Sequence, residues 1–525
     1  MQLVSYGAQD IYISGNPQIT FWKVLYKRHT NFAVESIEVT FNGQADFNKR
    51  VTAVINRNAD LMYKTYVQVV LPQIQITSGD QSVISGSSVT KGFRWLNYIG
   101  HRLIKQVEVE IGGQRIDRQY GDWMQIWTQL STEAGTVKAL DSIIGNTHDL
   151  VLMKRGNGYA LDSTCSSTET TISCLPRAGT PAKTLYIPLQ FWFCRNPGLA
   201  IPLIALQYHE VRINVDFETW QNCQYAEVQT GSPTAASAQS LAAASLYVDY
   251  VYLDTEERRR FAQQSHEYLI EQVQYTGAES ITSSSNKIQL NFNHPVKELF
   301  WVVQRDSFVD CSTSSWLASV GGAQPFNYSD DFSTDGIITS LLAQASGTSA
   351  TTVGTPTAAA ATATAVSAIL GQGATEASSL IGADSLDVTG DAEFDTSVNY
   401  LLAKVILDSG IRCEGKNPVE VAKLQLNGQD RFTEREGSYF DRVQPYQHHS
   451  RTPSTGINVY SFALRPEEHQ PSGTCNFSRI DKATLQLTVS LNTVTGSRTA
   501  QVRVYALNYN VLRVMSGMGG LAYSN

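Results

Sequence analysis

The sequence lacks the spacings in which cysteines usually bind metals or form a disulfide framework. Its seven cysteines include no C-x-x-C pair, and their number is odd, so neither a zinc site nor a complete set of disulfides is indicated. They lie at positions 165, 174, 194, 223, 311, 413 and 475. We expect reduced thiols, as in proteins made in a cytosol-like compartment.

An excess of positive charge is also lacking. Forty Lys and Arg face 48 Asp and Glu, which gives a net charge of −8, and a protein that wraps nucleic acid needs the opposite sign. Direct binding of nucleic acid is therefore not expected. Residues 1–18 show no basic segment followed by an apolar run, so no signal peptide is predicted. The most apolar long window, 355–373, is interrupted by Gly and is too weakly hydrophobic to span a bilayer.

Sequence motifs of catalysis are absent as well. There is no G-x-x-x-x-G-K-[ST] phosphate loop and no G-x-S-x-G nucleophile turn. The His-Glu dipeptides at 209–210 and 266–267 are followed by Ile213 and Ile270, where a zinc-protease helix needs its second histidine. We predict no catalytic residue, no cofactor and no metal site, and so a protein that is not an enzyme.

The remaining polar clusters have simpler interpretations. His448 and His449 are adjacent and would diverge on a strand, which favours a solvated or interface pair over a shared metal ion. Asp216 and Glu218 share one face of a predicted strand, as catalytic carboxylates do in glycoside hydrolases, but surface charge is the favoured interpretation. The basic run 256–260 is flanked by acidic residues, which indicates a solvated helix face or an interdomain salt-bridge cluster.

Two asparagines match the N-glycosylation sequon. Asn327 begins "NYS" and Asn476 begins "NFS", so both are candidate glycosylation sites. Without a signal peptide, the usual glycosylation machinery would not reach them.

Alternating apolar and polar residues, the pattern of half-buried strands, recur along the whole chain. Long helical patterns are scarce, and the best one covers 255–273. A chain of 525 residues exceeds the length at which one core keeps growing. We therefore expect mostly antiparallel β-sheet in two domains, with a helical or partly helical connector near the middle.

An internal repeat gives the domain organisation. "IGGQRIDRQYGDW" (111–123) is echoed by "LNGQDRFTEREGSYF" (426–440), with Gly113 and Gly428 315 residues apart. Tyr186 and Tyr460, like Val211 and Leu485, are 274 residues apart. The "GG-Q" and "NG-Q" sequences predict tight hairpin turns with positive φ, and "FNGQ" (41–44) is a third instance.

The polar residues after these turns alternate in sign and suit contacts at a domain or subunit boundary. They are Arg115, Asp117, Arg118, Asp430, Arg431, Glu434 and Arg435. Two antiparallel units joined by long loops fit tandem jelly-roll β-sandwich domains. Duplicated immunoglobulin-like domains are the rival, although their strands are spaced more evenly.

The predicted division of the chain has four parts. An N-terminal arm (1–30) precedes a first jelly roll (31–255), a connector (256–275) and a second jelly roll (276–525). The second jelly roll carries a long low-complexity insertion at about 310–398. Tracts rich in Ser, Thr, Ala and Gly cannot bury enough apolar area to form core, so we expect long surface loops.

Several long stretches resemble the major capsid protein of nucleocytoplasmic large DNA viruses. They are 15–43 ("GNPQITFWKVLYKRHTNFAVESIEVTFNG"), 100–127 ("GHRLIKQVEVEIGGQRIDRQYGDWMQIW"), 191–215 ("FWFCRNPGLAIPLIALQYHEVRINV") and 508–525 ("NYNVLRVMSGMGGLAYSN"). The resemblance implies two tandem jelly rolls per subunit and homotrimers that form pseudo-hexagonal capsomers. These capsomers tile the outer icosahedral shell of a virion assembled in the host cytoplasm.

The resemblance also implies partners. They are neighbouring capsomers, minor capsid and penton proteins, and an internal viral membrane adjacent to the inward-facing N-terminal arm, while long loops form the outward towers. We predict a structural capsid subunit. A β-sandwich carbohydrate-binding or glycoside-processing protein is the alternative. A minor or penton capsid protein, usually a single jelly roll, fits the duplication less well.

Overall fold

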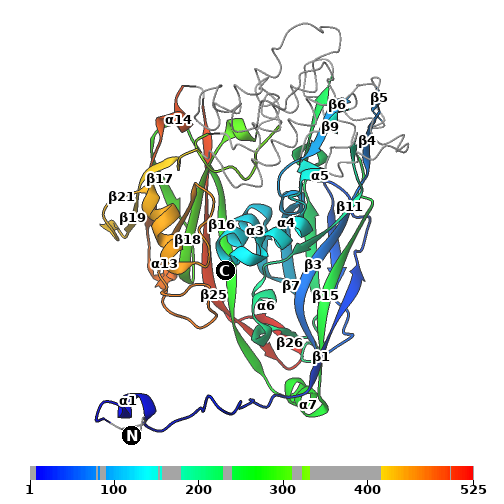
Figure 1. Cartoon of the computed structure of the whole chain (residues 1–525), viewed down its shortest axis with the longest axis vertical. Helices are drawn as coiled ribbons and strands as arrows, with labels where there is room; N and C mark the ends of the chain where they lie inside the picture. Colours follow the sequence, from blue (N-terminus) through cyan, green and yellow to red (C-terminus); the bar gives the residue numbers. More distant parts are fainter. Residues whose placement is uncertain are drawn as a thin grey trace, which may run out of the picture.

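The computed structural model describes most of both predicted domains (Figure 1). It describes residues 7–77, 81–82, 90–151, 154–155, 179–228, 239–309, 322–331, 415–496 and 498–523. Most of the predicted insertion at 310–398 therefore lies outside the described residues.

The first half of the chain folds into two facing antiparallel sheets. One has the strand order β1 (Phe32–Thr40), β15 (Ala243–Leu253), β3 (Leu61–Leu71) and β11 (Lys183–Pro188). The other has the order β2 (Arg50–Val54), β13 (Val211–Phe217), β7 (Ile104–Ile111) and β8 (Gln114–Tyr120). Alternate side chains such as Val67, Val109 and Ile213 fill one core between the sheets. Strands of period two thus bury one face and leave the other for contacts elsewhere.

The second half repeats this order strand for strand. One sheet runs β16 (His266–Ile281), β25 (Ala500–Met515), β18 (Pro295–Arg305) and β22 (Ile457–Ser461). The facing sheet runs β17 (Ser285–Leu290), β24 (Ala483–Val489), β19 (Val419–Leu426) and β20 (Gln429–Asp430). A second core lies between them, with Trp301 and Leu485 among its members. The duplication predicted from the sequence is confirmed.

Shorter elements complete the described fold. The α-helices, together with the π-helix η6, are α1 (Ile11–Ser14), α2 (Ile99–Leu103), α3 (Gly121–Ser131), α4 (Val137–Ile144), α5 (His148–Val151), α6 (Trp192–Arg195), α7 (Thr255–Gln263), η6 (Tyr439–Val443), α13 (Gln444–His448) and α14 (Leu491–Val494). The short strands are β4 (Ile74–Thr77), β5 (Gln81–Ser82), β6 (Thr90–Trp95), β9 (Lys154–Arg155), β10 (Gly179–Thr180), β12 (Ile201–Pro202), β14 (Gln224–Val228), β21 (Arg435–Glu436), β23 (Cys475–Asn476) and β26 (Met518–Leu521).

The two repeated turns are tight hairpins, as predicted. Gly112 and Gly113 have φ of 59° and 82° between β7 and β8, and Asn427 and Gly428 have 53° and 79° between β19 and β20. Gly43 also has positive φ, at 97°, but the hairpin prediction there is wrong. It lies between β1 and β2, which belong to different sheets.

The offset of 274 residues does not hold for single residues. Tyr186 points away from its core and is 41% exposed, whereas Tyr460 packs against the second core. On β24, the pairings with β7 and β19 make Ala483, not Leu485, the counterpart of Val211. Insertions between strands change the spacing, and an odd shift moves a side chain to the opposite face.

Two further expectations need correction. The helical pattern at 255–273 is a helix only to Gln263, because residues from His266 onward pair with β25 as strand β16. Within the predicted insertion at 310–398, residues 322–331 are described and are not a surface loop: Phe326 and Tyr328 are buried between the two halves. These aromatic side chains interrupt the low-complexity composition on which the loop prediction rested.

Candidate assembly surfaces

Helix α3 joins the two sandwiches. It leaves β8 of the first half and lies between the two halves (Figure 1). Four buried side chains cover the outer face of the second half's β16–β25–β18–β22 sheet: Trp123, Ile126, Trp127 and Leu130. Trp123 packs edge-on against Phe300 of β18, with ring centroids 5.0 Å apart. The two halves therefore share an apolar interface whose side chains are as buried as those of the sandwich cores.

The helix at this junction has a signal in the residue spacing, although its partner sheet does not. Trp123, Ile126, Trp127 and Leu130 follow the i, i+3, i+4, i+7 pattern of an amphipathic helix. The prediction of mostly antiparallel strands in this half did not include the helix Gly121–Ser131.

Buried charges cross the same junction. Arg195 of α6 stacks over the Trp127 ring, 4.1 Å from its centroid, and its Nη1 lies 2.9 Å from Oε2 of Glu271 on β16. The other Glu271 oxygen lies 2.5 Å from Nζ of Lys297, whose side chain is 1% exposed. One carboxylate thus forms ion pairs with two cations, the half-buried Arg195 of the first half and the buried Lys297 of the second.

The first repeated turn leads to a domain boundary, as predicted. Asp117 on β8 accepts a hydrogen bond from the Val273 amide of β16 at 3.1 Å. Burial raises the pKa of Asp117 to about 7, although that bond and the one from Gln119 oppose the shift. In the second half, Asp430 pairs with Lys423 at 2.6 Å on the exposed end of its own sheet. The repeated hairpins therefore have different surroundings in the single chain.

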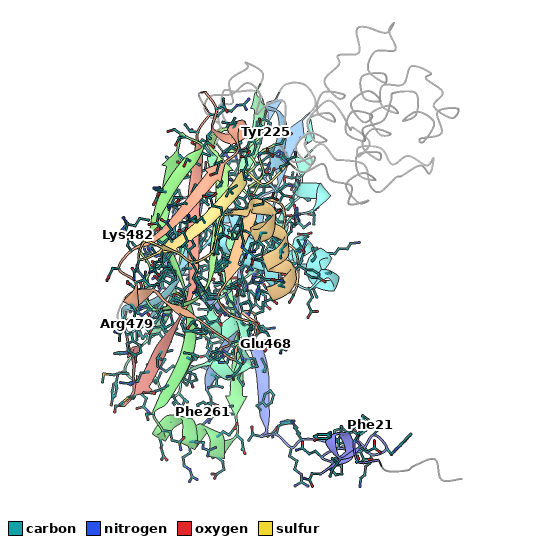
Figure 2. All side chains as sticks on the ribbon, turned by 90° about the vertical axis from the view of Figure 1, so that its left-hand side faces the viewer. Phe21, Tyr225, Phe261, Glu468, Arg479 and Lys482 are labelled. Carbon is teal, nitrogen blue, oxygen red and sulfur yellow. The ribbon has the colours of Figure 1, made fainter. Side chains whose placement is uncertain are left out.

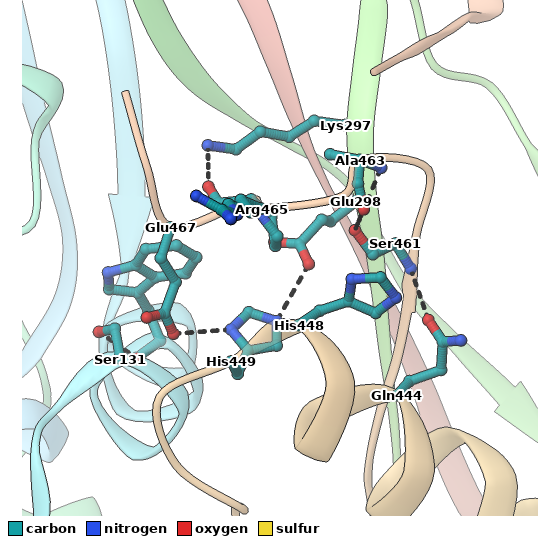
Figure 3. A network of polar contacts seen from close by, with 12 residues as sticks. Ser131, Lys297, Glu298, Gln444, His448, His449, Ser461, Ala463, Arg465 and Glu467 are labelled. Atoms are coloured by element: carbon teal, nitrogen blue, oxygen red, sulfur yellow. Dashed lines mark hydrogen bonds and ion pairs between the residues drawn. The ribbon is translucent and has the colours of Figure 1, made fainter. Parts of the chain in front are cut away.

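His449 lies inside a buried ionic cluster and is not a solvated residue. Its side chain has no solvent exposure, with Nε2 3.0 Å from Glu298 and Nδ1 2.9 Å from Glu467 (Figure 3). Burial opposes its positive charge, but the two carboxylates outweigh burial and raise the pKa of His449 to about 9. His448 faces away, with Nδ1 3.1 Å from the Leu464 carbonyl oxygen. The two rings do not converge on a shared site.

The candidate carboxylates have structural partners. Asp216 lies 3.4 Å from Arg50 Nε, while Glu218 follows the end of β13 and accepts hydrogen bonds from the Thr219 amide and Asn222 side chain. The predicted common strand face is therefore wrong for Glu218.

The run 256–260 forms the exposed helix α7. Arg258 in this run binds the buried Asp60 at 2.9 Å, a salt bridge that fastens α7 to the first half. This contact supports the salt-bridge interpretation of the run.

The two sequon asparagines differ in accessibility. Asn327 is half-buried, and its amide nitrogen donates to Gln324 at 2.7 Å and to the Asp331 carbonyl at 2.8 Å. Asn476 is exposed beside β18, and its side-chain oxygen accepts from the Ser478 amide at 3.0 Å. The Asn476 side chain is the more accessible acceptor.

The N-terminal arm leaves the body of the molecule beside α7 (Figure 1). Its aromatic side chains are exposed, with Phe21 at 90% and Trp22 at 96%, and Phe21 lies clear of both sandwiches (Figure 2). Neither side chain contributes to the folded cores. An exposed apolar segment of this kind indicates a surface that another component covers.

Other chemistry is limited in the described part of the chain. No described helix is long and apolar enough to cross a membrane, and no group of three or more His, Cys, Asp or Glu there could hold a metal ion. Cys194, Cys223 and Cys475 are free thiols. Burial raises the pKa of Cys194 to about 11 and that of Cys223 to about 12, so these two thiols are unreactive.

Comparisons with known proteins agree with this duplicated architecture. Residues 20–254 match the family described as "Major capsid protein N-terminus", and residues 257–520 match "Large eukaryotic DNA virus major capsid protein". The major capsid protein of Phaeocystis pouchetii virus is 58% identical, over 100% of this chain and 99% of that protein. The chain belongs to the large eukaryotic DNA virus major capsid proteins.

Further relatives of this capsid protein extend the match. The major capsid protein of Paramecium bursaria Chlorella virus 1 is 37% identical, over 100% of this chain and 99% of that protein. The quasi-atomic capsid of PBCV-1 is 32% identical, covers 96% of this chain and 100% of that chain, and has a TM-score of 0.61. The Faustovirus major capsid protein, at 14% identity, a TM-score of 0.63 and coverage of 97% and 95%, shows the fold alone.

These matches confirm the predicted double jelly roll and the structural role in the virion capsid. The family consists of structural capsid proteins and not of enzymes. The carbohydrate-processing alternative receives no support.

Proposed function

We propose that this capsid protein assembles as a homotrimer that forms a pseudo-hexagonal capsomer of an icosahedral shell. The observation that supports this proposal is the identical strand order of the two sandwiches. Three chains with two similar units each present six similar edges around a threefold axis, so a closed trimer imitates a hexagon. The first unit corresponds to the predicted domain 31–255. The second takes in all of β16 from His266, so it begins ahead of the predicted residue 276 and shortens the connector to the segment around α7.

The position of the N-terminal arm distinguishes the two ends of the molecule. Strands β5, β6 and β9 and helix α14 lie at one end, and α7 and the arm lie at the other (Figure 1). We assign the arm, residues 1–30, to the inner side of the shell. There, its exposed aromatic and basic side chains meet minor capsid and penton proteins or the layer next to an internal membrane.

Assembly takes place in the host cytoplasm under this proposal. The free thiols of Cys194, Cys223 and Cys475 fit a reducing compartment. Asn476 is the better of the two sequon positions for a glycan because it is exposed.

Light scattering on the purified protein tests the trimer. We expect a mass about three times 57.8 kDa, and hexagonal outlines in electron micrographs. A species that stays at 57.8 kDa at every accessible concentration would contradict the proposal. Deletion of residues 345–390, which lie outside the described part, should leave the trimer mass, less the deleted residues, unchanged if that tract is a surface loop.

A separate deletion tests the arm. Removal of residues 7–30 should leave the trimer intact because Phe21 and Trp22 contribute to no core. The same deletion should abolish incorporation into particles when the remaining virion proteins are supplied. Normal incorporation would show that the arm has another role.

A further inference from the structure

Two glycines, Gly121 and Gly437, occupy equivalent positions in the two halves of the chain. A Cβ on Gly121 would collide with the carbonyl oxygen of Ile104, and a Cβ on Gly437 would collide with that of Val419. Ile104 and Val419 begin β7 and β19 and lie 315 residues apart, the same offset as the repeated hairpin glycines. Gly121 and Gly437 are therefore equivalent, and a helical segment follows each of them.

The equivalent segments differ in what covers them. Counted from the glycines, the junction residues Trp123, Ile126, Trp127 and Leu130 correspond to Tyr439, Arg442, Val443 and Tyr446. The first four are buried against the second half. In the second half, Val443 is 39% exposed, Tyr446 is 83% exposed, and the Arg442 side chain is 47% exposed. The segment from Tyr439 to His448, which begins as a π-helix, thus follows its glycine as α3 does. Tyr439 packs against the second core, but none of the described sheets covers Val443 and Tyr446.

The sheet that would receive such a segment is also present and uncovered in the first half. Helix α3 rests on a row of paired residues in which Tyr275, Tyr505 and Phe300 lie side by side across β16, β25 and β18. The equivalent row across β1, β15 and β3 is Glu38, Tyr247 and Tyr66.

These three side chains point away from the first core. Glu38 is exposed, and Tyr247 and Tyr66 are half-exposed. Within the part of the chain that the structure describes, no helix covers this row of the first sheet, whereas the second sheet holds α3 at the same place.

The charges on the two uncovered surfaces are complementary. In the intrachain junction, Ile126 packs against an apolar sheet that includes Leu507. In the equivalent surfaces, Arg442 replaces Ile126, and Asp249 occupies the position of Leu507, as the pairings of β15 and β25 with their neighbours show. A matched change of both sides to opposite charges indicates that the two surfaces meet. Their polarity keeps them soluble before assembly.

We propose that the segment Tyr439–His448 of one copy docks on the outer face of β1, β15 and β3 of a second copy. This inference rests on the proposed trimer and names its contact. The occupant is a second copy because the same chain already makes the equivalent contact within itself. Each copy offers one segment and one face, so the contact is heterologous. A closed ring of three copies then contains three intrachain junctions that alternate with three interchain junctions.

Charge reversal tests this contact in the full chain. Arg442→Glu should weaken the trimer at least tenfold in dissociation constant, measured by light scattering over a dilution series. The double variant Arg442→Glu with Asp249→Arg should recover trimer at concentrations where the single variant is monomeric. Arg479→Glu, at another exposed arginine of the same half, is the matched control and should leave the trimer unchanged.

A second variant separates docking from folding. Arg442 also donates to the Pro453 carbonyl and Thr455 and has its Nε 3.9 Å from Asp441, so its substitution also removes contacts within the segment. Tyr446→Glu changes a side chain that is 83% exposed and should weaken the trimer while the melting temperature of the monomer stays the same. Trimers as tight as native in both Arg442→Glu and Tyr446→Glu would overturn this inference and leave the trimer proposal standing. A native protein that never trimerises would instead overturn the proposed function.

Discussion

Arg195 and Glu271 connect the two jelly rolls through a buried ion pair, with Nη1 and Oε2 2.9 Å apart. Lys297 approaches the other oxygen of the same carboxylate. Because water has little access to these groups, the Glu271 carboxylate is the main source of electrostatic stabilisation for the positive charges of Arg195 and Lys297. The stability of the pair of domains therefore depends on one side chain of β16.

The substitution Glu271→Gln should lower the free energy of unfolding by about 3–5 kcal/mol, because it removes the counter-ion of the buried Lys297 and of the half-buried Arg195. Glu267→Gln is the control on the same strand. It breaks an ion pair with Arg513 whose side chains are 58% and 51% exposed, so its cost should be about 0–1 kcal/mol. Urea unfolding midpoints measure both. Equal effects of the two substitutions would show that the buried carboxylate has no special role.

His449 should make stability depend on pH. Its folded pKa of about 9 lies above the value of 6.5 expected when unfolded, so the folded state binds the proton more tightly. The contribution is complete below pH 6.5 and is lost as pH rises toward 9. It amounts to roughly 3 kcal/mol, at about 1.4 kcal/mol for each pH unit between the two values.

Melting curves from pH 6 to 9.5 test this dependence. The difference in stability between the native protein and His449→Gln should shrink as pH rises. His448→Gln should follow the native pH profile, because that ring lies outside the pair of carboxylates. A constant difference between native and His449→Gln across the range would contradict a charged His449.

Trp127 should couple the unfolding of the two jelly rolls. Its ring is buried between Arg195 and the second sheet, and truncation of a buried tryptophan costs about 3–5 kcal/mol. In Trp127→Ala, we expect calorimetry to resolve two transitions in place of one, since the junction no longer links the domains. Trp22→Ala, in the exposed arm, should leave the trace unchanged. A single unshifted transition in Trp127→Ala would show that other contacts hold the halves together.

The features that depend on local residue periodicity, the strands and their duplication, could be predicted from the sequence. Alternation identified the strands, and the glycine turns at Gly113 and Gly428 identified the duplication. It did not predict which faces meet across the junction, because the helical spacing around Trp127 has no partner in the sequence itself. His449 and Glu298 are 151 residues apart, so their pairing depends on the folded chain.

The repeated glycines give a last prediction. Gly437→Ala places a Cβ against the Val419 carbonyl oxygen, and such overpacking costs about 1–3 kcal/mol when the backbone must shift. That shift would displace the adjoining segment at Tyr439, so the trimer should weaken together with the stability. Gly135→Ala is the matched control, because a Cβ there meets nothing within 4 Å. If Gly437→Ala proved as stable and as trimeric as Gly135→Ala, the close approach to β19 would not position this segment, and the equivalence with Gly121 would lose its structural basis.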